Sequence, residues 1–269
     1  MIEPMIEPII ESMVELPVVQ PFPWQQLVQY LSFRLVPEFE SVENNHYQRI
    51  YRDGLVRVTF DESRGLLQIK SDLPEDQLDD AIARVSRIFR PQLCTKIIYQ
   101  QLLPHLPMLE KTLGFRPLGC WDPFELCLRT IIGQQVTVAA ANTIMARLIQ
   151  RCGQLTPEAV IAADLNDMGM PGARVATLLT LASAIADGEL DLSMPWPDLK
   201  DALIKLRGIG PWTCGYLAIR LGMDEDAFPE TDVGLIRSAK AESAKALLAS
   251  AEQWRPYRAY AAVGLWAID

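Results

Sequence analysis

The chain has 269 residues, of which 49% are hydrophobic and 22% are charged, and its mean hydropathy is +0.09. This balance excludes a disordered chain, and no apolar run reaches the roughly 18 residues that a membrane span needs. Lys and Arg number 25 against 34 Asp and Glu, a formal net charge of -9. Taken alone, that charge argues against a nucleic-acid-binding protein held by a broad basic surface.

The first 16 residues form a repeat of four tetrads, and the third residue of each tetrad is a glutamate: Glu3, Glu7, Glu11 and Glu15. Pro4 and Pro8 would interrupt a helix. We therefore expect residues 1–19 to be an acidic, largely disordered extension or a docking peptide rather than a folded element. The segment has Glu where a secretory leader needs Lys or Arg, which favours a cytoplasmic protein of the bacterial cytosol or nucleoid.

Residues 20–112 carry the signals of an α+β domain. Segments 47–52 and 55–60 flank an Asp-Gly turn, and a second turn leads into 66–70, which predicts a small antiparallel meander. After Pro74, apolar residues recur at helical spacing. This pattern predicts a helix that covers one face of the sheet.

From residue 113 onward the strand signals give way to helical ones. Candidate helices lie within 122–150, 174–186, 199–206 and 211–221, from Asp232 onward, and over 256–268. We therefore expect an α+β fold in which the sheet domain is followed by an all-helical domain over residues 113–269.

The five cysteines are scattered and include no C-x-x-C pair: Cys94, Cys120, Cys127, Cys152 and Cys214. A disulfide framework, a zinc site or an iron–sulfur site would need clustered spacing. We expect reduced cysteines in a cytosolic protein.

The segment 203–220 reads as a helix, a tight Gly-Ile-Gly turn and a second helix that opens at Pro211. Gly208 and Gly210 permit positive φ and a close backbone approach, so N–H groups at the start of the second helix can point at a phosphate. Such a grip uses backbone dipoles and is compatible with an acidic composition. The spacing alone also fits an ordinary helix–helix connection.

A second informative segment runs over 226–237. Thr231 is suited to cap a helix, with Asp232 in the first turn, where the helix dipole favours a carboxylate. By itself this pattern indicates only a helix start. Aromatic residues gather around both segments, and they suit either core packing or a pocket that stacks a flat base: Trp212, Tyr216, Trp254, Tyr257, Tyr260 and Trp266.

Taken together, the runs 208–214 and 228–232 resemble the hairpin and catalytic aspartate of the helix-hairpin-helix DNA glycosylases. Within that superfamily the chain is similar to AlkA-type DNA-3-methyladenine glycosylase II, over residues 20–269, with the hairpin at about 199–221. Four further stretches carry the resemblance, at 117–125, 131–140, 170–174 and 254–260.

The resemblance implies a monofunctional glycosylase that flips alkylated bases, of the 3-methyladenine and 7-methylguanine type, and hydrolyses the N-glycosidic bond in base excision repair. Asp232 would be the catalytic carboxylate that opposes the positive charge developing on the deoxyribose. A single carboxylate would suffice, because an alkylated purine already carries a positive charge and is an activated leaving group.

The resemblance also assigns binding residues. Four aromatic residues would line the base pocket: Trp212, Tyr216, Trp266 and Tyr30. Gln135 would be the wedge that fills the gap left by the flipped nucleotide, where some members of the family have Leu. Contacts to double-stranded, damaged DNA would come from Gln135 and from the hairpin: Arg207, Gly208, Ile209, Gly210 and Thr213.

Relatives that also cut the backbone carry a Lys where this chain has Trp212, so we expect no lyase activity. We expect no required cofactor and no iron–sulfur cluster, because four cysteines after the last helix are missing. The resemblance does imply a monovalent cation, Na⁺ or K⁺, on hairpin carbonyls: those of Ile204, Leu206 and Ile209. The chain departs from the family pattern in having Glu230-Thr231 where some members have a second Asp, and Cys214 where Ala is common.

Two alternatives stay open: a glycosylase for oxidised or deaminated bases, and a non-catalytic protein that binds damaged DNA. We expect a monomer. The net charge of the whole chain does not represent the segment that carries the hairpin. Four of the negative charges lie in the first 16 residues, while residues 200–269 hold nine basic and nine acidic residues. A few local contacts therefore predict weak affinity for undamaged DNA with a shallow salt dependence.

Overall fold

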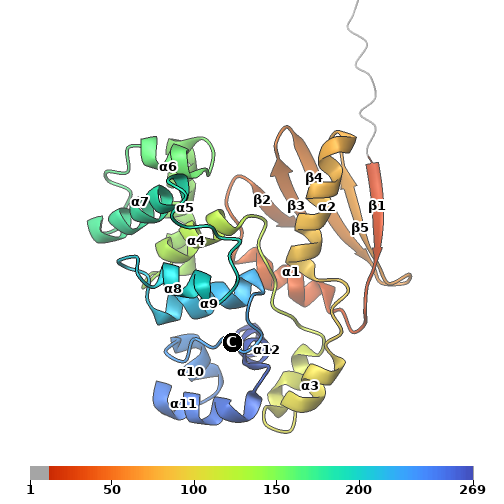
Figure 1. The fold of residues 1–269 in the computed structure, drawn as a ribbon. Helices are drawn as coiled ribbons and strands as arrows, with labels where there is room; N and C mark the ends of the chain where they lie inside the picture. The colour runs from red at the N-terminus through yellow and green to blue at the C-terminus, as the bar shows by residue number, and fades with distance from the viewer. Residues whose placement is uncertain (1–11, 269) are drawn as a thin grey trace, which may run out of the picture.

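The computed structural model describes residues 12–268 and shows a sheet domain joined to a larger helical part (Figure 1). The sheet is antiparallel with five strands in the order β1-β5-β4-β3-β2. Its strands are β1 (Ser12–Pro17), β2 (Glu40–Glu43), β3 (His46–Tyr51), β4 (Gly54–Asp61) and β5 (Leu66–Ser71). The meander predicted from the two turn signals is confirmed as β3–β5, and the α+β class is confirmed with it.

Strand register places one face of the sheet against a helix. Tyr47 of β3 lies opposite Val58 of β4, which lies opposite Ile69 of β5, and all three side chains are buried. The helix α2 (Glu75–Phe89) covers this face, and the ring of its Phe89 contacts Tyr47 edge-on at 5.6 Å between centroids. In the strands alternate side chains are buried, and in α2 the buried side chains recur at helical spacing. These two sets of side chains pack together in one core.

The expectation that residues 1–19 stay outside the fold is wrong for β1. This strand pairs with β5, with Val14 opposite Ile69, and the guanidinium of Arg64 donates two hydrogen bonds to Glu15, at 2.6 and 2.8 Å. The tetrad repeat hid the alternation of a short edge strand. Val18 and Val19, which follow β1, donate backbone hydrogen bonds to the carbonyls of Gly65 at 3.0 Å and Pro91 at 2.8 Å. Residues 1–11 of the predicted extension lie outside the described residues.

Twelve α-helices and two 3-10 turns complete the described part of the chain. Besides α2 they are α1 (Trp24–Ser32), α3 (Lys96–Leu102), η1 (Pro107–Thr112), α4 (Pro123–Ile132), α5 (Val138–Cys152), α6 (Pro157–Ala162), α7 (Gly172–Ala186), α8 (Asp198–Leu203), α9 (Pro211–Leu221), α10 (Val233–Ser238), α11 (Ala244–Ala251), η2 (Glu252–Trp254) and α12 (Arg258–Ala267). No helix within residues 12–268 is long and apolar enough to cross a membrane.

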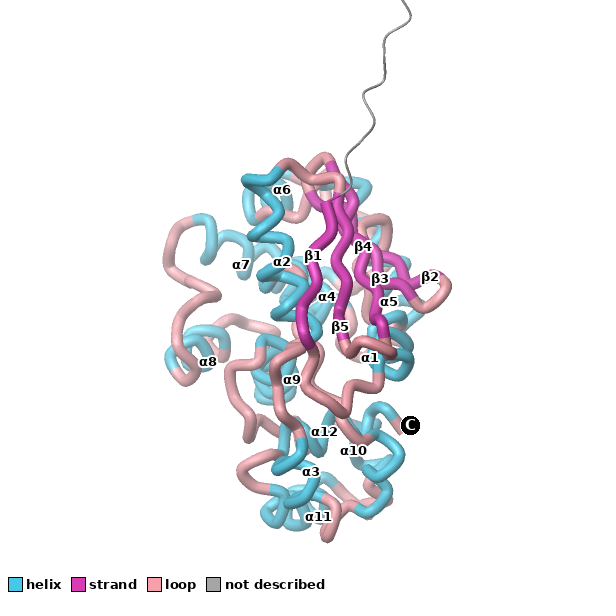
Figure 2. Tube along the Cα trace, turned by 90° about the vertical axis from the view of Figure 1, so that its right-hand side faces the viewer, coloured by secondary structure: helices cyan, strands magenta, loops and turns pink. Residues whose placement is uncertain are grey.

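The helices after residue 113 do not form one packing unit. Side chains of α4–α8 surround one hydrophobic core, while those of α10–α12 share a second core with the sheet, α1, α2 and α3. Figures 1 and 2 show α10–α12 beside α3, away from α4–α7. Helix α9 belongs to both cores, since Leu217 packs in the first and Ala218 in the second.

The site is therefore built where α1, α4, α9 and α12 converge. The chain leaves the sheet domain, forms α4–α9, and returns to it with α12. Residues 113–122, called here the crossing segment, connect η1 to α4. Buried Arg116 anchors this segment by donating to the backbone carbonyls of Pro21 at 2.7 Å and Gly114 at 3.0 Å. Burial lowers the pKa of this guanidinium to about 10.

Candidate active site

Asp232 is the N-cap of α10. Its backbone is extended, and its Oδ1 accepts a hydrogen bond from the N–H of Leu235 at 2.9 Å. The expectation that Thr231 caps this helix is wrong by one residue, because an Asp side chain is at least as good an N-cap as Thr. The capping bond fixes the rotamer of a half-buried carboxylate at the end of a loop.

Two indole N–H groups from distant helices hold the same carboxylate. Trp212 of α9 donates to Oδ2 at 2.9 Å, and Trp266 of α12 donates to Oδ1 at 3.0 Å. An indole nitrogen can only donate, so both tryptophans complement a carboxylate anion. Gly234 leaves room for this arrangement, because a Cβ there would lie 3.1 Å from Oδ1 of Asp232.

The tryptophans belong to an aromatic cluster with Tyr216. Trp212 and Tyr216, one helical turn apart in α9, stack at 5.5 Å with 13° between ring planes, and Trp266 meets Tyr216 at 5.7 Å and 56°. These three side chains and Asp232 line a cavity of about 680 Å³. The structure thus brings together four of the five residues that the resemblance assigned to catalysis and base binding.

Tyr30, the fifth of these residues, lies beside the cavity rather than among the residues that line it. Its side chain is buried, the guanidinium carbon of Arg34 lies 3.6 Å from its ring centroid, and it lines an adjoining cavity together with Trp266. Burial raises the pKa of the Tyr30 phenol, and the nearby charge of Arg34 opposes the shift. A role in base contact would require Tyr30 to act through this second cavity.

Three arginines that sequence reasoning missed surround the aromatic cluster. Arg34 and Arg129 line the cavity, and Arg220 donates to the hydroxyl of Tyr216 at 3.0 Å. Burial by itself would raise the pKa of Tyr216, but the charges of these arginines, Arg220 first, lower it. The four-residue spacing of Tyr216 and Arg220 along a helix was the available signal for that contact.

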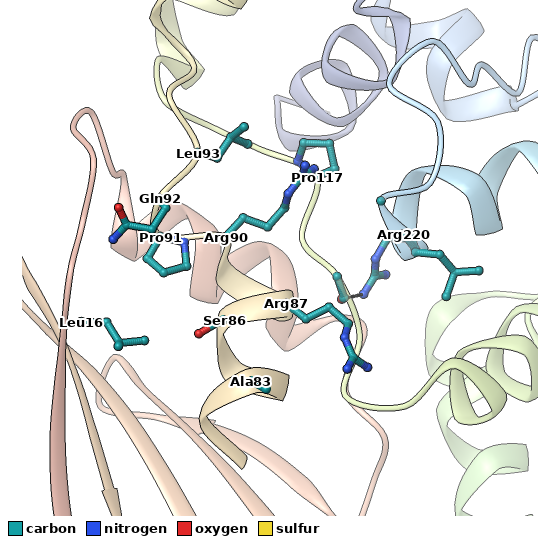
Figure 3. A pocket seen from close by; sticks show the side chains of 13 residues that line it. Leu16, Ala83, Ser86, Arg87, Arg90, Pro91, Gln92, Leu93, Pro117 and Arg220 are labelled. Atoms are coloured by element: carbon teal, nitrogen blue, oxygen red, sulfur yellow. Dashed lines mark hydrogen bonds between the residues drawn. The ribbon is translucent and has the colours of Figure 1, made fainter. Parts of the chain in front are cut away.

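Arg220 also lines a third cavity, of about 620 Å³. Its other nitrogens donate to the carbonyls of Leu118 at 2.7 Å and Gly119 at 2.9 Å. Figure 3 shows Arg87, Arg90 and Arg220 around this cavity, at the end of α2 and beside the crossing segment. Arg220 therefore connects the wall of one cavity to the aromatic lining of the other.

The hairpin connects α8 to α9 as the spacing predicts. Gly208 has φ +93°, and a Cβ at this position would lie 2.1 Å from Oγ1 of Thr177, so only glycine fits. The Thr177 hydroxyl donates to the carbonyl of Arg207 at 3.0 Å and holds the turn on α7. Gly210 caps α9 without a side chain and Pro211 has no N–H, so the first-turn amides of Trp212 and Thr213 have no acceptor within the helix.

The predicted DNA contacts of the hairpin differ in exposure. Arg207 and Gly208 are exposed, whereas Ile209 is buried and Thr213 as a whole residue is only 2% exposed. Thr213 therefore presents almost no surface to a phosphate. Of the three carbonyls proposed to hold a cation, that of Leu206 also accepts a hydrogen bond from the N–H of Ile209 at 3.0 Å.

Gln135 lies in the turn between α4 and α5, next to the hairpin. Its φ is +56° and its side chain is exposed. The preceding residue, Gln134, donates from Nε2 to the carbonyl of Gly208 and to Oγ1 of Thr213, both at 3.0 Å. The residue next to the candidate wedge is thus bonded to the hairpin turn and to the start of α9, which together form the candidate phosphate grip.

Two family models match the chain: the AlkA N-terminal domain over residues 13–122, and the HhH-GPD superfamily base excision DNA repair protein over residues 128–245. The first match begins inside β1 and ends at the N-cap of α4. The chain is 32% identical to DNA-3-methyladenine glycosylase 2 of Escherichia coli over 269 aligned residues. This alignment covers 91% of this chain and 94% of that protein.

Solved structures share the fold. The 3-methyladenine DNA-glycosylase from Archaeoglobus fulgidus superposes with a TM-score of 0.79 at 19% identity, over 95% of this chain and 97% of that one. The 3-methyladenine DNA glycosylase of Schizosaccharomyces pombe, in complex with abasic DNA, superposes with a TM-score of 0.56 at 25% identity, over 64% of this chain and 94% of that one.

Proposed function

Because the chain belongs to the DNA-3-methyladenine glycosylase family of base excision repair proteins, we propose that it is a monofunctional enzyme that excises 3-methyladenine and 7-methylguanine from double-stranded DNA. One observation carries the proposal: the Asp232 carboxylate is held between two indole N–H groups at the wall of an aromatic cavity. We further propose that the protein acts as a monomer in the bacterial cytosol or nucleoid.

The role of Asp232 in this proposal is to stabilise the sugar as the base departs. As the bond between C1′ and the base nitrogen breaks, its electron pair leaves with the base and neutralises the positive charge of an alkylated purine. The deoxyribose becomes an oxocarbenium-like cation, which a fixed carboxylate stabilises. Water then forms the new bond to C1′ and gives up a proton, for which Asp232 is the nearest acceptor in this proposal.

Trp212, Tyr216 and Trp266 supply the base contacts. Their rings have electron-rich faces that attract a flat cation, and stacking of this kind selects alkylated purines without a unique hydrogen-bond pattern. The cavity of about 680 Å³ is large enough for one extruded base. Tyr30 and Arg34 border the adjoining space, where they would limit how far the base enters.

The absence of a lyase step rests on the lining of the cavity. No lysine lines it within residues 12–268, and the position where a Schiff base would form is Trp212. An abasic site would therefore be the product. Reduction with borohydride during turnover should leave no protein–DNA adduct.

DNA would be held by the hairpin and the turn before α5. Backbone amides of Trp212 and Thr213 at the start of α9 suit a phosphate, and exposed Arg207 adds a charge beside Gly208, Ile209 and Gly210. Gln135 would enter the gap left by the flipped nucleotide. The carbonyls of Ile204, Leu206 and Ile209 would hold the monovalent cation, which would supply positive charge for a DNA phosphate.

A base-release assay on methylated duplex DNA tests the proposal. Wild-type protein should release 3-methyladenine and 7-methylguanine, and Asp232→Asn should abolish release while keeping duplex binding. Asp187→Asn, an exposed change at the end of α7, is the matched control and should leave release unchanged. Unchanged release by Asp232→Asn would overturn the assignment, and preferred release of hypoxanthine or 8-oxoguanine would overturn the substrate class.

A further inference from the structure

Gln134 joins two elements that the proposed function uses separately. Its side-chain nitrogen lies 3.0 Å from the carbonyl oxygen of Gly208 and 3.0 Å from the hydroxyl oxygen of Thr213. Gly208 lies in the turn of the hairpin, and Thr213 lies in the first turn of α9. One amide group thus uses both of its N–H donors on the two sides of the hairpin.

The two acceptors lie in closely packed positions. Gly208 has φ +93°, and a Cβ there would lie 2.1 Å from Oγ1 of Thr177, so the turn of the hairpin packs closely on α7. Thr213 is 2% exposed. The side chain of Gln134 is therefore bonded to two closely packed points of the hairpin.

The turn between α4 and α5, residues 133–137 and called here the wedge turn, has other anchors as well: Val136 packs against the core of α4–α8, and the N–H of Gln134 donates to the carbonyl of Ile131 at 3.3 Å. Gln135 occupies the left-handed region at φ +56°, a conformation that non-glycine residues rarely adopt. On its far side, Thr137 caps α5 by accepting the N–H of Ala140 at 3.2 Å. On its near side, the Gln134 amide is the side-chain contact that links the turn to the hairpin.

We propose that Gln134 is a positioning residue that sets the height of the wedge relative to the phosphate grip. A phosphate bound at the start of α9 would then hold Gln135 at the depth needed to enter the base stack. This inference rests on the proposed function, because it takes Gln135 as the wedge and α9 as the phosphate site. It adds that the two act as one unit through a single side chain.

The test uses Gln134→Met, which keeps the length of the side chain and removes both donors. Flipping is followed by the fluorescence of 2-aminopurine placed next to a 7-methylguanine, and release is followed in single turnover. A misplaced wedge should lower the flipping amplitude and reduce release by about 100-fold. Affinity for an undamaged duplex and the melting temperature should stay at wild-type values, because the hairpin amides are untouched.

Three further variants separate positioning from space filling. Gln134→Glu keeps the shape but turns a carboxylate oxygen toward the carbonyl of Gly208, so it should flip less well than Gln134→Met. Gln150→Met, the same change on exposed α5 where the amide contacts Glu38, should behave as wild type. Thr213→Val removes one acceptor, and its effect should be smaller in the Gln134→Met background than alone.

The outcomes divide cleanly between this inference and the proposed function. Wild-type flipping and release by Gln134→Met would overturn the positioning role. Parallel loss of undamaged-duplex binding and flipping would also overturn it, since Gln134 would then merely maintain the hairpin. If wild-type protein releases no base, the proposed function fails, while the 2-aminopurine signal still reports whether Gln134 controls the wedge.

Discussion

The indole nitrogen of Trp212 lies 2.9 Å from Oδ2 of Asp232, so one side chain of α9 both stacks on Tyr216 and holds the carboxylate. In the proposed function, base binding and carboxylate orientation would therefore be joined in a single residue. Trp266 repeats the arrangement from α12 on the other carboxylate oxygen.

Replacing Trp212 with Phe should separate the two roles. The ring still stacks, but the carboxylate loses one donor and gains rotational freedom, so single-turnover release should fall by about 10- to 100-fold with little change in KM. Trp196→Phe, at a half-buried tryptophan outside the lining of the cavity, is the control. A variant whose KM rises while kcat stays constant would show that Trp212 serves stacking alone.

Gly234→Ala should lower activity while leaving stability equal or higher. The added Cβ lies 3.1 Å from Oδ1 of Asp232 and 3.6 Å from Cδ1 of Trp266, so the carboxylate must shift by a few tenths of an ångström. The same change in helix α10 removes backbone freedom from the unfolded chain, which is worth about 0.4–1 kcal/mol. Urea unfolding and base release on the same samples check both halves, and loss of both together would point to simple misfolding.

Gly208→Ala should damage the hairpin in a way that a second change partly repairs. A Cβ at φ +93° lies 2.1 Å from Oγ1 of Thr177, so we expect both a clash and backbone strain of about 1–3 kcal/mol. The melting temperature and the affinity for undamaged duplex should fall. Thr177→Ala in the same chain removes the clashing oxygen and should restore part of the stability, whereas equal losses in the single and double variants would contradict this account.

Much of the fold follows from local patterns. Strands β3–β5 and helix α2 were predicted because the Asp-Gly turn at 53–54, the second turn at 61–65 and the regular spacing of apolar residues are local signals. Strand β1 was missed because its partner β5 is distant in sequence and a proline-containing repeat masked its alternation. Strand β2 has only four residues, too few to show a period.

The site was predictable as a list of residues but not as a set of contacts. Asp232, Trp212 and Trp266 came from motif resemblance, whereas the hydrogen bonds that join them depend on α12 returning to α9. Arg34, Arg129 and Arg220 carry no motif of their own, and their approach to Tyr216 exists only in three dimensions. The sequence did not single out Gln134, because Gln134 and Gln135 are the same residue type. Only the backbone conformation shows which of the two side chains contacts the hairpin.

A buried ion pair between the two parts of the molecule should give the protein a pH-dependent stability. Arg49 of β3 lies 2.6 Å from Oε1 of Glu125 on α4, and both side chains are buried. Burial raises the pKa of Glu125 from its ordinary 4.5 to about 7, although Arg49 opposes the shift.

The sign of the dependence follows from proton binding. Between pH 4.5 and 7 the folded protein holds a proton on Glu125 that the unfolded chain has released, so the free energy of unfolding falls as pH rises through this window. A shift of this size corresponds to about 3 kcal/mol. Urea unfolding at several pH values should show a smaller decline between pH 4.5 and 7 for Glu125→Gln than for wild type. Gln stays neutral at every pH and mimics the protonated carboxyl beside Arg49, so the slope is the readout. Equal slopes would show that Glu125 stays ionised in the folded protein.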